Sequence, residues 1–288
     1  MMRFQKAWAI DETREGGVRS GVLGLLFACM MVGLGACSAS SGGPNVAEQE
    51  LRVFAAASLR EAFEEIGAQF EAANAGVRVV FNFAGSQQLA QQIGQGAPAD
   101  VFASANQAQM EEVVATGDVA SGTEQVFARN RLVVIYPGDN PANLQSLQDL
   151  ARPGVRLVLA AEEVPVGQYT MEFLEKASTE PALGEGFQEG VLGNVASYEE
   201  NVRAVLSKVA LGEADAGIVY TSDVAGEASE IGRIEIPGAL NTIAEYPIAA
   251  IQGAGQEELA QRFIEYVLSE EGQAVLARYG FIPVQGGS

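Results

Sequence analysis

From residue 51 onward, short apolar runs alternate with segments in which apolar residues recur at helical spacing. Residues 51–57 predict a buried strand, after which Leu59, Phe63, Ile66 and Phe70 recur every three or four residues, as on one face of a helix. Strands that alternate with helices are typical of α/β proteins, so the sequence predicts an α/β fold.

The same alternation of strands and helices continues to the C-terminus, and we expect its elements to form two lobes. Further strands are expected at residues 77–83, 101–104, 131–136, 155–160, 216–220 and 246–251, and helices at 87–93, 107–116, 168–177, 201–211 and 257–279. A chain of 288 residues is long enough for two cores. With crossings expected near residues 129–131 and 239–245, we predict one lobe from residues 51–130 plus 240–288, and a second from residues 131–239.

The N-terminal region has the features of an export signal. Residues 22–34 form an apolar run of 13 residues, shorter than the roughly 20 that span a bilayer. The ending Leu34-Gly35-Ala36-Cys37 resembles a bacterial lipobox, which implies that residues 1–36 are removed and that Cys37 carries lipid; an ordinary signal peptide or a buried cysteine are the alternatives. Residues 37–50 are rich in Ser, Gly, Pro and Glu and predict a flexible tether. We therefore expect a lipid-anchored protein of the cell envelope, on the periplasmic or extracellular face of the membrane.

Charge and residue usage exclude several classes of function. The net charge of −20 disfavours nucleic acid as a partner, because its phosphates would be repelled. Without histidine there is no Ser-His-Asp triad, and Lys176 and Lys208 lie in predicted helices away from the serines considered below, so no enzyme is expected. With Cys29 in the predicted signal and Cys37 at its end, the remaining chain has no thiolate for a transition-metal site.

Several strand or loop ends lead into helix N-termini through small or hydroxyl-bearing residues, at positions 57–58, 84–86, 165–167 and 201–202. Helix N-termini expose unpaired N–H groups and partial positive charge, so converging ones form an anion site without Lys or Arg. Each junction also has an ordinary explanation. Ser58 and Glu61 have capping-box spacing, Ser86 is a common type of helix cap, and a strand-end Tyr220 often only packs its ring.

These segments stand in the order found in the periplasmic molybdate-binding proteins of ABC importers, which the chain resembles from about residue 51 to 283. The matching segments are VFAAASL (53–59), FAGSQQLA (83–90), GAPADVFAS (96–104), VPVGQY (164–169), ENVR (200–203), GIVYTSD (217–223) and, less specifically, EGQAVLARYGF (271–281). The resemblance implies a type II periplasmic-binding-protein (Venus-flytrap) fold with a hinge between two sheet-and-helix lobes. It also implies a monomer without a cofactor, partnered by an ABC permease and its ATPase.

The resemblance implies a site for molybdate or tungstate made of hydroxyl donors from Ser58, Ser86 and Tyr220 and main-chain N–H donors from Val166 and Val202. Because all five groups donate, a fully deprotonated dianion suits them better than hydrogen phosphate. Two alternatives remain open, namely another oxyanion such as sulfate in the same fold, and a ligand sensor that signals to a membrane partner.

The start of the helix near residue 201 has two solutions. Ser197 and Glu200 have capping-box spacing, which would start the helix early and use the Val202 N–H within it. Asn201 as the cap would leave Val202 at the first helical position with its N–H free. We expect the second, because it agrees with the family pattern.

Overall fold

The computed structural model describes residues 49–225 and 231–284 of the chain. Residues 1–48, which contain Cys37 and nearly all of the predicted signal and tether, lie outside the described residues. The first strand begins at Gln49, inside the segment expected to be a tether. Within the described ranges no helix is both long and apolar enough to cross a membrane.

The first sheet combines parallel and antiparallel pairing. Its described strands are, in spatial order, β11 (Ile282–Pro283), β4 (Gln125–Asn130), β10 (Ala244–Ala250), β3 (Val101–Ala103), β1 (Gln49–Ala56) and β2 (Val77–Ala84). β1 is parallel to both β2 and β3, whereas β10 is antiparallel to β3 and β4. Parallel neighbours bring the carboxyl ends of β1 and β2 to the same edge, where the chain continues into helices.

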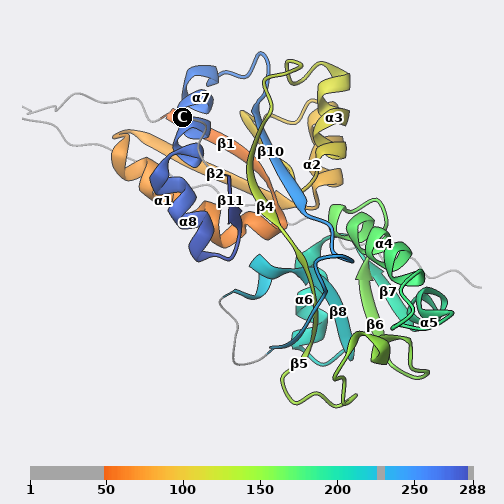
Figure 1. Ribbon diagram of the computed structural model, residues 1–288. Coiled ribbons are helices and arrows are strands. Elements are labelled where there is room, and N and C mark those ends of the chain that lie inside the picture. Colours follow the sequence, from red (N-terminus) through yellow and green to blue (C-terminus); the bar gives the residue numbers. More distant parts are fainter. Residues whose placement is uncertain (1–48, 226–230, 285–288) are drawn as a thin grey trace, which may run out of the picture. The chain divides into compact units, whose positions relative to one another are not determined.

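Helices cover both faces of this sheet (Figure 1). They are α1 (Arg60–Ala73), α7 (Glu257–Leu268) and α8 (Glu270–Arg278) on one side, and α2 (Ser86–Gly94) and α3 (Gln107–Thr116) on the other. Phe63 of α1 packs against Phe127 and Phe263 with ring centroids 5.6 and 6.1 Å apart. On β1, Val53 faces this core and Phe54 faces the core under α2 and α3, as expected for a central strand buried on both sides.

The second sheet is built from the middle of the chain. Its described strands, in spatial order, are β7 (Val195–Glu199), β6 (Leu157–Ala160), β8 (Ala216–Tyr220), β5 (Leu132–Pro137) and β9 (Ile231–Glu235). Its helices are α4 (Pro165–Ser178), α5 (Phe187–Gly193) and α6 (Val202–Ala210). Short 3-10 helices are η1 (Ala57–Leu59), η2 (Leu147–Ala151) and η3 (Thr221–Val224). The sequence-based prediction of an α/β fold is confirmed.

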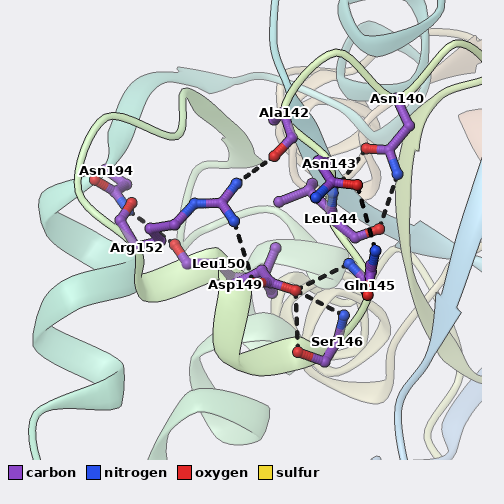
Figure 2. A network of polar contacts seen from close by, with 10 residues as sticks. All are labelled: Asn140, Ala142, Asn143, Leu144, Gln145, Ser146, Asp149, Leu150, Arg152 and Asn194. Carbon is purple, nitrogen blue, oxygen red and sulfur yellow. Dashed lines mark hydrogen bonds and ion pairs between the residues drawn. The ribbon is translucent and has the colours of Figure 1, made fainter.

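The long connection from β5 to β6 is held by polar contacts (Figure 2). The side chain of Asn140 both accepts from the Leu144 N–H and donates to the Leu144 carbonyl, each at 2.8 Å. Asp149 accepts from the N–H groups of Gln145 and Ser146 at 2.9 Å, and the Gln145 N–H holds the pKa of this carboxyl below its usual value. These bonds fix a segment that has no strand partner.

Two of the differences between the predicted and the observed elements have identifiable reasons. Residues 257–279 form two helices, because Ser269 is extended (φ −67°, ψ 166°) and its hydroxyl caps α8 by accepting from the Gly272 N–H. The predicted strand at 131–136 is preceded by β4, which the sequence analysis missed along with α5, β7, β9 and β11. The break at Arg131 has no Gly or Pro; instead the Asn130 side chain accepts from the Arg131 N–H where the chain passes between sheets.

The chain passes between the two sheets at Arg131 and again along residues 236–243, between β9 and β10 (Figure 1). Asn241 ties the second passage to the first, because its side chain accepts from the N–H and donates to the carbonyl of Leu132 at 3.1 and 2.8 Å. That residues 51–130 with 240–288, and residues 131–239, move as separate lobes stays a prediction.

Candidate functional site

A small cavity lies where the two sheets and their helices meet. The volume open to the centre of a water molecule is about 20 Å³. On the same measure one buried water needs roughly 10–15 Å³, so the cavity is only slightly larger. It therefore suits a small, compact group better than an extended organic solute. The lining residues are Ala56, Ala57, Ser58, Ala84, Gly85, Ser86, Ala105, Val164, Pro165, Val166, Asn201, Val202 and Tyr220.

The two serines of the cavity lie at the carboxyl ends of neighbouring parallel strands. Ser58 lies in η1, directly after β1, and its Oγ is 3.0 Å from the hydroxyl of Tyr246. Ser86 is the first residue of α2, and its Oγ accepts a hydrogen bond from the Ala105 N–H at 3.0 Å. Both side chains are buried, so each hydroxyl is held in place by a partner beneath the cavity.

Two helix N-termini of the second sheet's layer also reach the cavity. Val202 is the first residue of α6, and Asn201 caps this helix by accepting from the Ala204 N–H at 3.0 Å. Val166 is the second residue of α4, after Pro165. N–H groups in the first turn have no acceptor within their own helix, so Val166 and Val202 are free to donate through the main chain while their side chains pack in the core.

Tyr220 contributes a hydroxyl from the end of β8. Its side chain is 1% exposed, and its oxygen has no hydrogen-bond partner among the described residues. Burial, together with nearby Tyr246, raises the pKa of Tyr220 well above the ordinary value, so the phenol stays protonated. A buried hydroxyl without a partner costs roughly 1–3 kcal/mol, which a ligand oxygen could recover.

The cavity attracts negative charge without cationic side chains. None of the described residues that line it is charged. The N-termini of α2, α4 and α6 supply partial positive charge instead. The described part of the chain also holds no cluster of His, Cys, Asp or Glu suited to a metal cation. The arrangement fits an anion held by hydrogen bonds.

A carboxyl lies behind Tyr220 rather than in the cavity. Asp223 accepts from the Tyr220 N–H at 3.0 Å, and its other oxygen is 3.7 Å from the Arg203 guanidinium. Burial raises the pKa of Asp223 to about 7, although Arg203 acts in the opposite direction. Arg203 also pairs with Glu61 of α1 at 2.6 Å, so it connects α6 with the helices of the first sheet.

Amide side chains connect the two rims of the cavity. Gln87 donates to the main-chain carbonyl of Glu200 at 2.9 Å, and Gln88 donates to the Glu200 carboxylate at 3.0 Å. Farther along, Asn106 donates to Gln168 of α4 at 2.9 Å. The elements around the cavity are therefore connected by hydrogen bonds from amide side chains, and one of the acceptors is a carboxylate.

All five residues predicted as donors line this one cavity; that they bind an anion stays a prediction. The expected Asn201 cap is confirmed. The capping-box interpretation of Ser58 is wrong, because α1 begins at Arg60 with Leu59 as its cap, and Glu61 pairs elsewhere. Ser86 does not cap α2 either, since Gly85 occupies that position and the Ser86 hydroxyl faces Ala105.

Sequence reasoning missed Tyr246 and Asn130, which lie directly behind Ser58. Asn130 Nδ2 is 3.5 Å from the Tyr246 hydroxyl, and both residues are completely buried. The local sequence around Asn130, the last residue of β4, gave no clear signal, because the charged Arg129 precedes it. Tyr246 lies 188 residues from Ser58, and no local pattern predicts that contact.

Comparison with known proteins identifies the family of the chain. The family described as bacterial extracellular solute-binding protein matches residues 51–282. The molybdate-binding protein ModA of Mycobacterium tuberculosis is 40% identical over 263 residues, covering 90% of this chain and 96% of that protein. The chain belongs to the bacterial extracellular solute-binding protein family, and the resemblance to molybdate-binding proteins inferred from the sequence is confirmed.

Solved structures confirm the type II periplasmic-binding-protein fold. The periplasmic molybdate-binding protein of Azotobacter vinelandii superposes with a TM-score of 0.70 at 21% identity, covering 82% of this chain and 100% of that one. The sulfate-binding protein SubI of M. tuberculosis superposes with a TM-score of 0.73 at 18% identity, covering 82% and 88%. Because proteins for two different anions superpose about equally well, the fold alone does not identify the solute.

Proposed function

We propose that this protein captures molybdate, and its close analogue tungstate, in the cavity between the two sheets and delivers it to an ABC importer. The observation that carries the proposal is the donor set. Ser58, Ser86 and Tyr220 offer hydroxyls and Val166 and Val202 offer main-chain N–H groups around a cavity of compact size. The 40% identity to a molybdate-binding protein supports the choice of ion.

The donors come from both sheets, which gives a reason for ligand-dependent closure. Ser58 and Ser86 follow strands of the first sheet, whereas Val166 and Val202 begin helices of the second sheet's layer and Tyr220 ends its strand β8. An anion that touches all five stabilises the form in which the two lobes approach each other. We propose that residues 51–130 with 240–288 form one lobe, that residues 131–239 form the other, and that the passages near residues 131 and 236–243 act as the hinge.

Sulfate is the second candidate, because a sulfate-binding protein shares the fold and sulfate is also a tetrahedral dianion. Both ions carry no proton and only accept hydrogen bonds, so the site can distinguish them mainly by their size. Each tenfold preference between them requires about 1.4 kcal/mol of difference in binding free energy. A cavity this small converts a mismatch in size into lost hydrogen bonds on one side.

The test is calorimetric titration of the purified domain with molybdate, tungstate, sulfate and phosphate in one buffer. We expect heat and tight binding for the first two and weak binding for the others. Thermal unfolding provides a second measurement, because a ligand at a hundred times its dissociation constant adds about 2.7 kcal/mol of stability. Sulfate affinity equal to that of molybdate would assign the protein to the second candidate.

We further propose that residues 1–36 are removed on export and that Cys37 is lipidated, which would hold a monomeric binding protein near its permease and ATPase. The lipobox-like ending Leu34 to Cys37 supports this. Mass spectrometry of the protein from its native membrane should find a diacylglyceryl or triacyl adduct on Cys37. An unmodified, freely released protein in cells with an active lipoprotein pathway would contradict the anchor.

A further inference from the structure

Ser58 and Tyr246 share a hydrogen bond whose direction decides what Ser58 can offer to the cavity. Their oxygens are 3.0 Å apart and both side chains are buried. If Ser58 donates to Tyr246, its lone pairs face the cavity. If Tyr246 donates to Ser58, the Ser58 hydrogen is free for the cavity. The surrounding groups distinguish these two cases.

Asn130 lies on the other side of Tyr246, and its amide has a defined orientation. The Arg131 N–H, which can only donate, lies 2.9 Å from one side-chain atom of Asn130, so that atom is the carbonyl oxygen. Thr221 donates to the same oxygen at 2.9 Å. The Asn130 NH₂ therefore faces Ser222 at 2.7 Å and Tyr246 at 3.5 Å, and it can only donate to the tyrosine oxygen.

Asn130 accepts nothing from Tyr246, and the nearby Tyr220 hydroxyl makes no geometric hydrogen bond, so Ser58 Oγ, 3.0 Å away, is the acceptor at bonding distance for the tyrosine hydrogen. Were Ser58 the donor, the buried Tyr246 hydrogen would be left without a partner, at a cost of roughly 1–3 kcal/mol. Burial also raises the pKa of Tyr246 well above the ordinary value, so this hydrogen is present at all ordinary pH values. The chain of bonds thus runs from Asn130 through Tyr246 to Ser58.

We propose that Tyr246 is a positioning and specificity-determining residue: by donating to Ser58 Oγ, it makes Ser58 a donor toward the cavity and disfavours oxyanions that carry a proton. The inference rests on the proposed function, since it concerns the same site. A protonated oxyanion needs an acceptor for its hydrogen, and the occupied Ser58 oxygen is a poor one. Tyr246 itself does not line the cavity.

Ser86 reaches the same state by a different route, which supports the interpretation. Its oxygen accepts from the Ala105 N–H, a group that cannot reverse direction. Both serines of the cavity therefore receive a hydrogen bond from beneath and keep their own hydrogen for the ligand. Ser86 is set by the main chain and cannot be altered by a side-chain change at Ala105, whereas the Ser58 arrangement is removable by Tyr246→Phe.

The experiment compares Tyr246→Phe with Tyr266→Phe, using molybdate and inorganic phosphate as probes at neutral pH. Tyr266 of α7 is a matched control, because its hydroxyl also makes a hydrogen bond, donating to Gln69 of α1 at 3.0 Å. This contact lies among the helices that cover the first sheet and away from the cavity. We expect Tyr246→Phe to weaken molybdate binding about tenfold and to weaken phosphate binding less, which narrows the preference. In a Ser58→Ala background, Tyr246→Phe should add no further loss of molybdate affinity.

Equal effects of the two tyrosine variants, or additive losses in the double variant Ser58→Ala/Tyr246→Phe, would overturn the inference while leaving the proposed function intact. Wild-type protein that prefers phosphate to molybdate would overturn the proposed function instead. Neutron diffraction of the ligand-free protein in deuterated solvent tests the hydrogen bond without any ligand. It should show the Tyr246 deuteron on the line to Ser58 Oγ, and a deuteron pointing elsewhere would refute the inference.

Discussion

In the first-sheet half of the cavity, the donors are serine hydroxyls that already receive a hydrogen bond from the protein. In the second-sheet half, the donors are main-chain N–H groups of Val166 and Val202 and a Tyr220 hydroxyl with no partner among the described residues. In the first half each serine oxygen has a protein partner before a ligand arrives, whereas in the second half the Tyr220 hydroxyl has none without a ligand. Substitutions of the serines should therefore lower both the stability of the ligand-free protein and the affinity for the ligand. Substitutions in the second half should lower mainly the affinity.

The largest expected effect concerns the carboxyl behind the second half. Asp223 has a pKa of about 7 in the folded protein against 3.8 in the unfolded chain. The stability it contributes is therefore full below pH 3.8 and is lost as pH rises through 7, by about 4 kcal/mol in all. Denaturant unfolding of Asp223→Asn should lack this fall, so the variant gains on the wild type as pH rises. Exposed Asp139→Asn is the control; an identical pH profile for Asp223→Asn and the wild type would contradict the prediction.

Val202→Pro tests whether the second half donates through the main chain. Proline is tolerated at the first helical position and lacks only the N–H, so α6 should survive while molybdate affinity falls about 100-fold. Val202→Ala keeps the N–H and should bind nearly as the wild type does. Calorimetry measures both affinities, and circular dichroism checks the helix. If both variants bind alike, the main-chain donor does not contact the ion.

Tyr220→Phe and Ser86→Ala compare the halves directly. Removing the Tyr220 hydroxyl leaves no protein group unpaired, so the ligand-free unfolding temperature should hold or rise while affinity falls about 10-fold to 100-fold. Removing the Ser86 hydroxyl leaves the buried Ala105 N–H without its acceptor, so stability and affinity should both fall. Thermal unfolding without molybdate measures the stability of each variant, and the shift on adding molybdate measures its affinity. A ligand-free protein destabilised equally by both changes would erase the difference between the halves.

The smallest expected effect concerns the approach of the rims. Gly85 has φ −61° and ψ 138°, which any residue can adopt, yet a Cβ there would lie 2.6 Å from the Glu200 carbonyl oxygen. Gly85→Ala should therefore fold normally but weaken molybdate binding by about threefold to tenfold, because the rims are kept apart. Gly193→Ala, where a Cβ meets nothing within 4 Å, is the control. Unchanged affinity in Gly85→Ala would mean that the rims need not approach this closely.

How far the sequence predicts the molecule differs between local and distant features. The helix at residues 107–116 and the strand at 216–220 were predicted to the residue, because periodicity and flanking turns are local signals. The Asn201 cap was predicted for a different reason, since local spacing also allowed a Ser197/Glu200 capping box and the family resemblance decided between them. The break between β4 and β5 was missed, because the side chain of Asn130, not a Gly or Pro, accompanies it.

The residues of the site also divide into those that local sequence segments predict and those that only distant contacts reveal. The five donor positions lie in short segments whose order along the chain carries the resemblance, so they could be named without coordinates. The groups that orient them could not. Ser58 meets Tyr246, and Ser86 meets the Ala105 N–H, only because strands distant in sequence lie in one sheet. Likewise Arg203 of α6 meets Glu61 of α1 only after both sheets have formed.

The uncharged lining of the cavity has a kinetic consequence. Sites that use Lys or Arg draw anions in by long-range attraction, and their capture rates fall as salt is added. Here the chain carries a net charge of −20 and the cavity has no charged lining residue among those described, so an approaching dianion is repelled until it is within hydrogen-bonding range. Added salt shortens the reach of that repulsion to about 8–10 Å. The capture rate should therefore rise with ionic strength, and the protein would load its ligand faster in brackish than in fresh water.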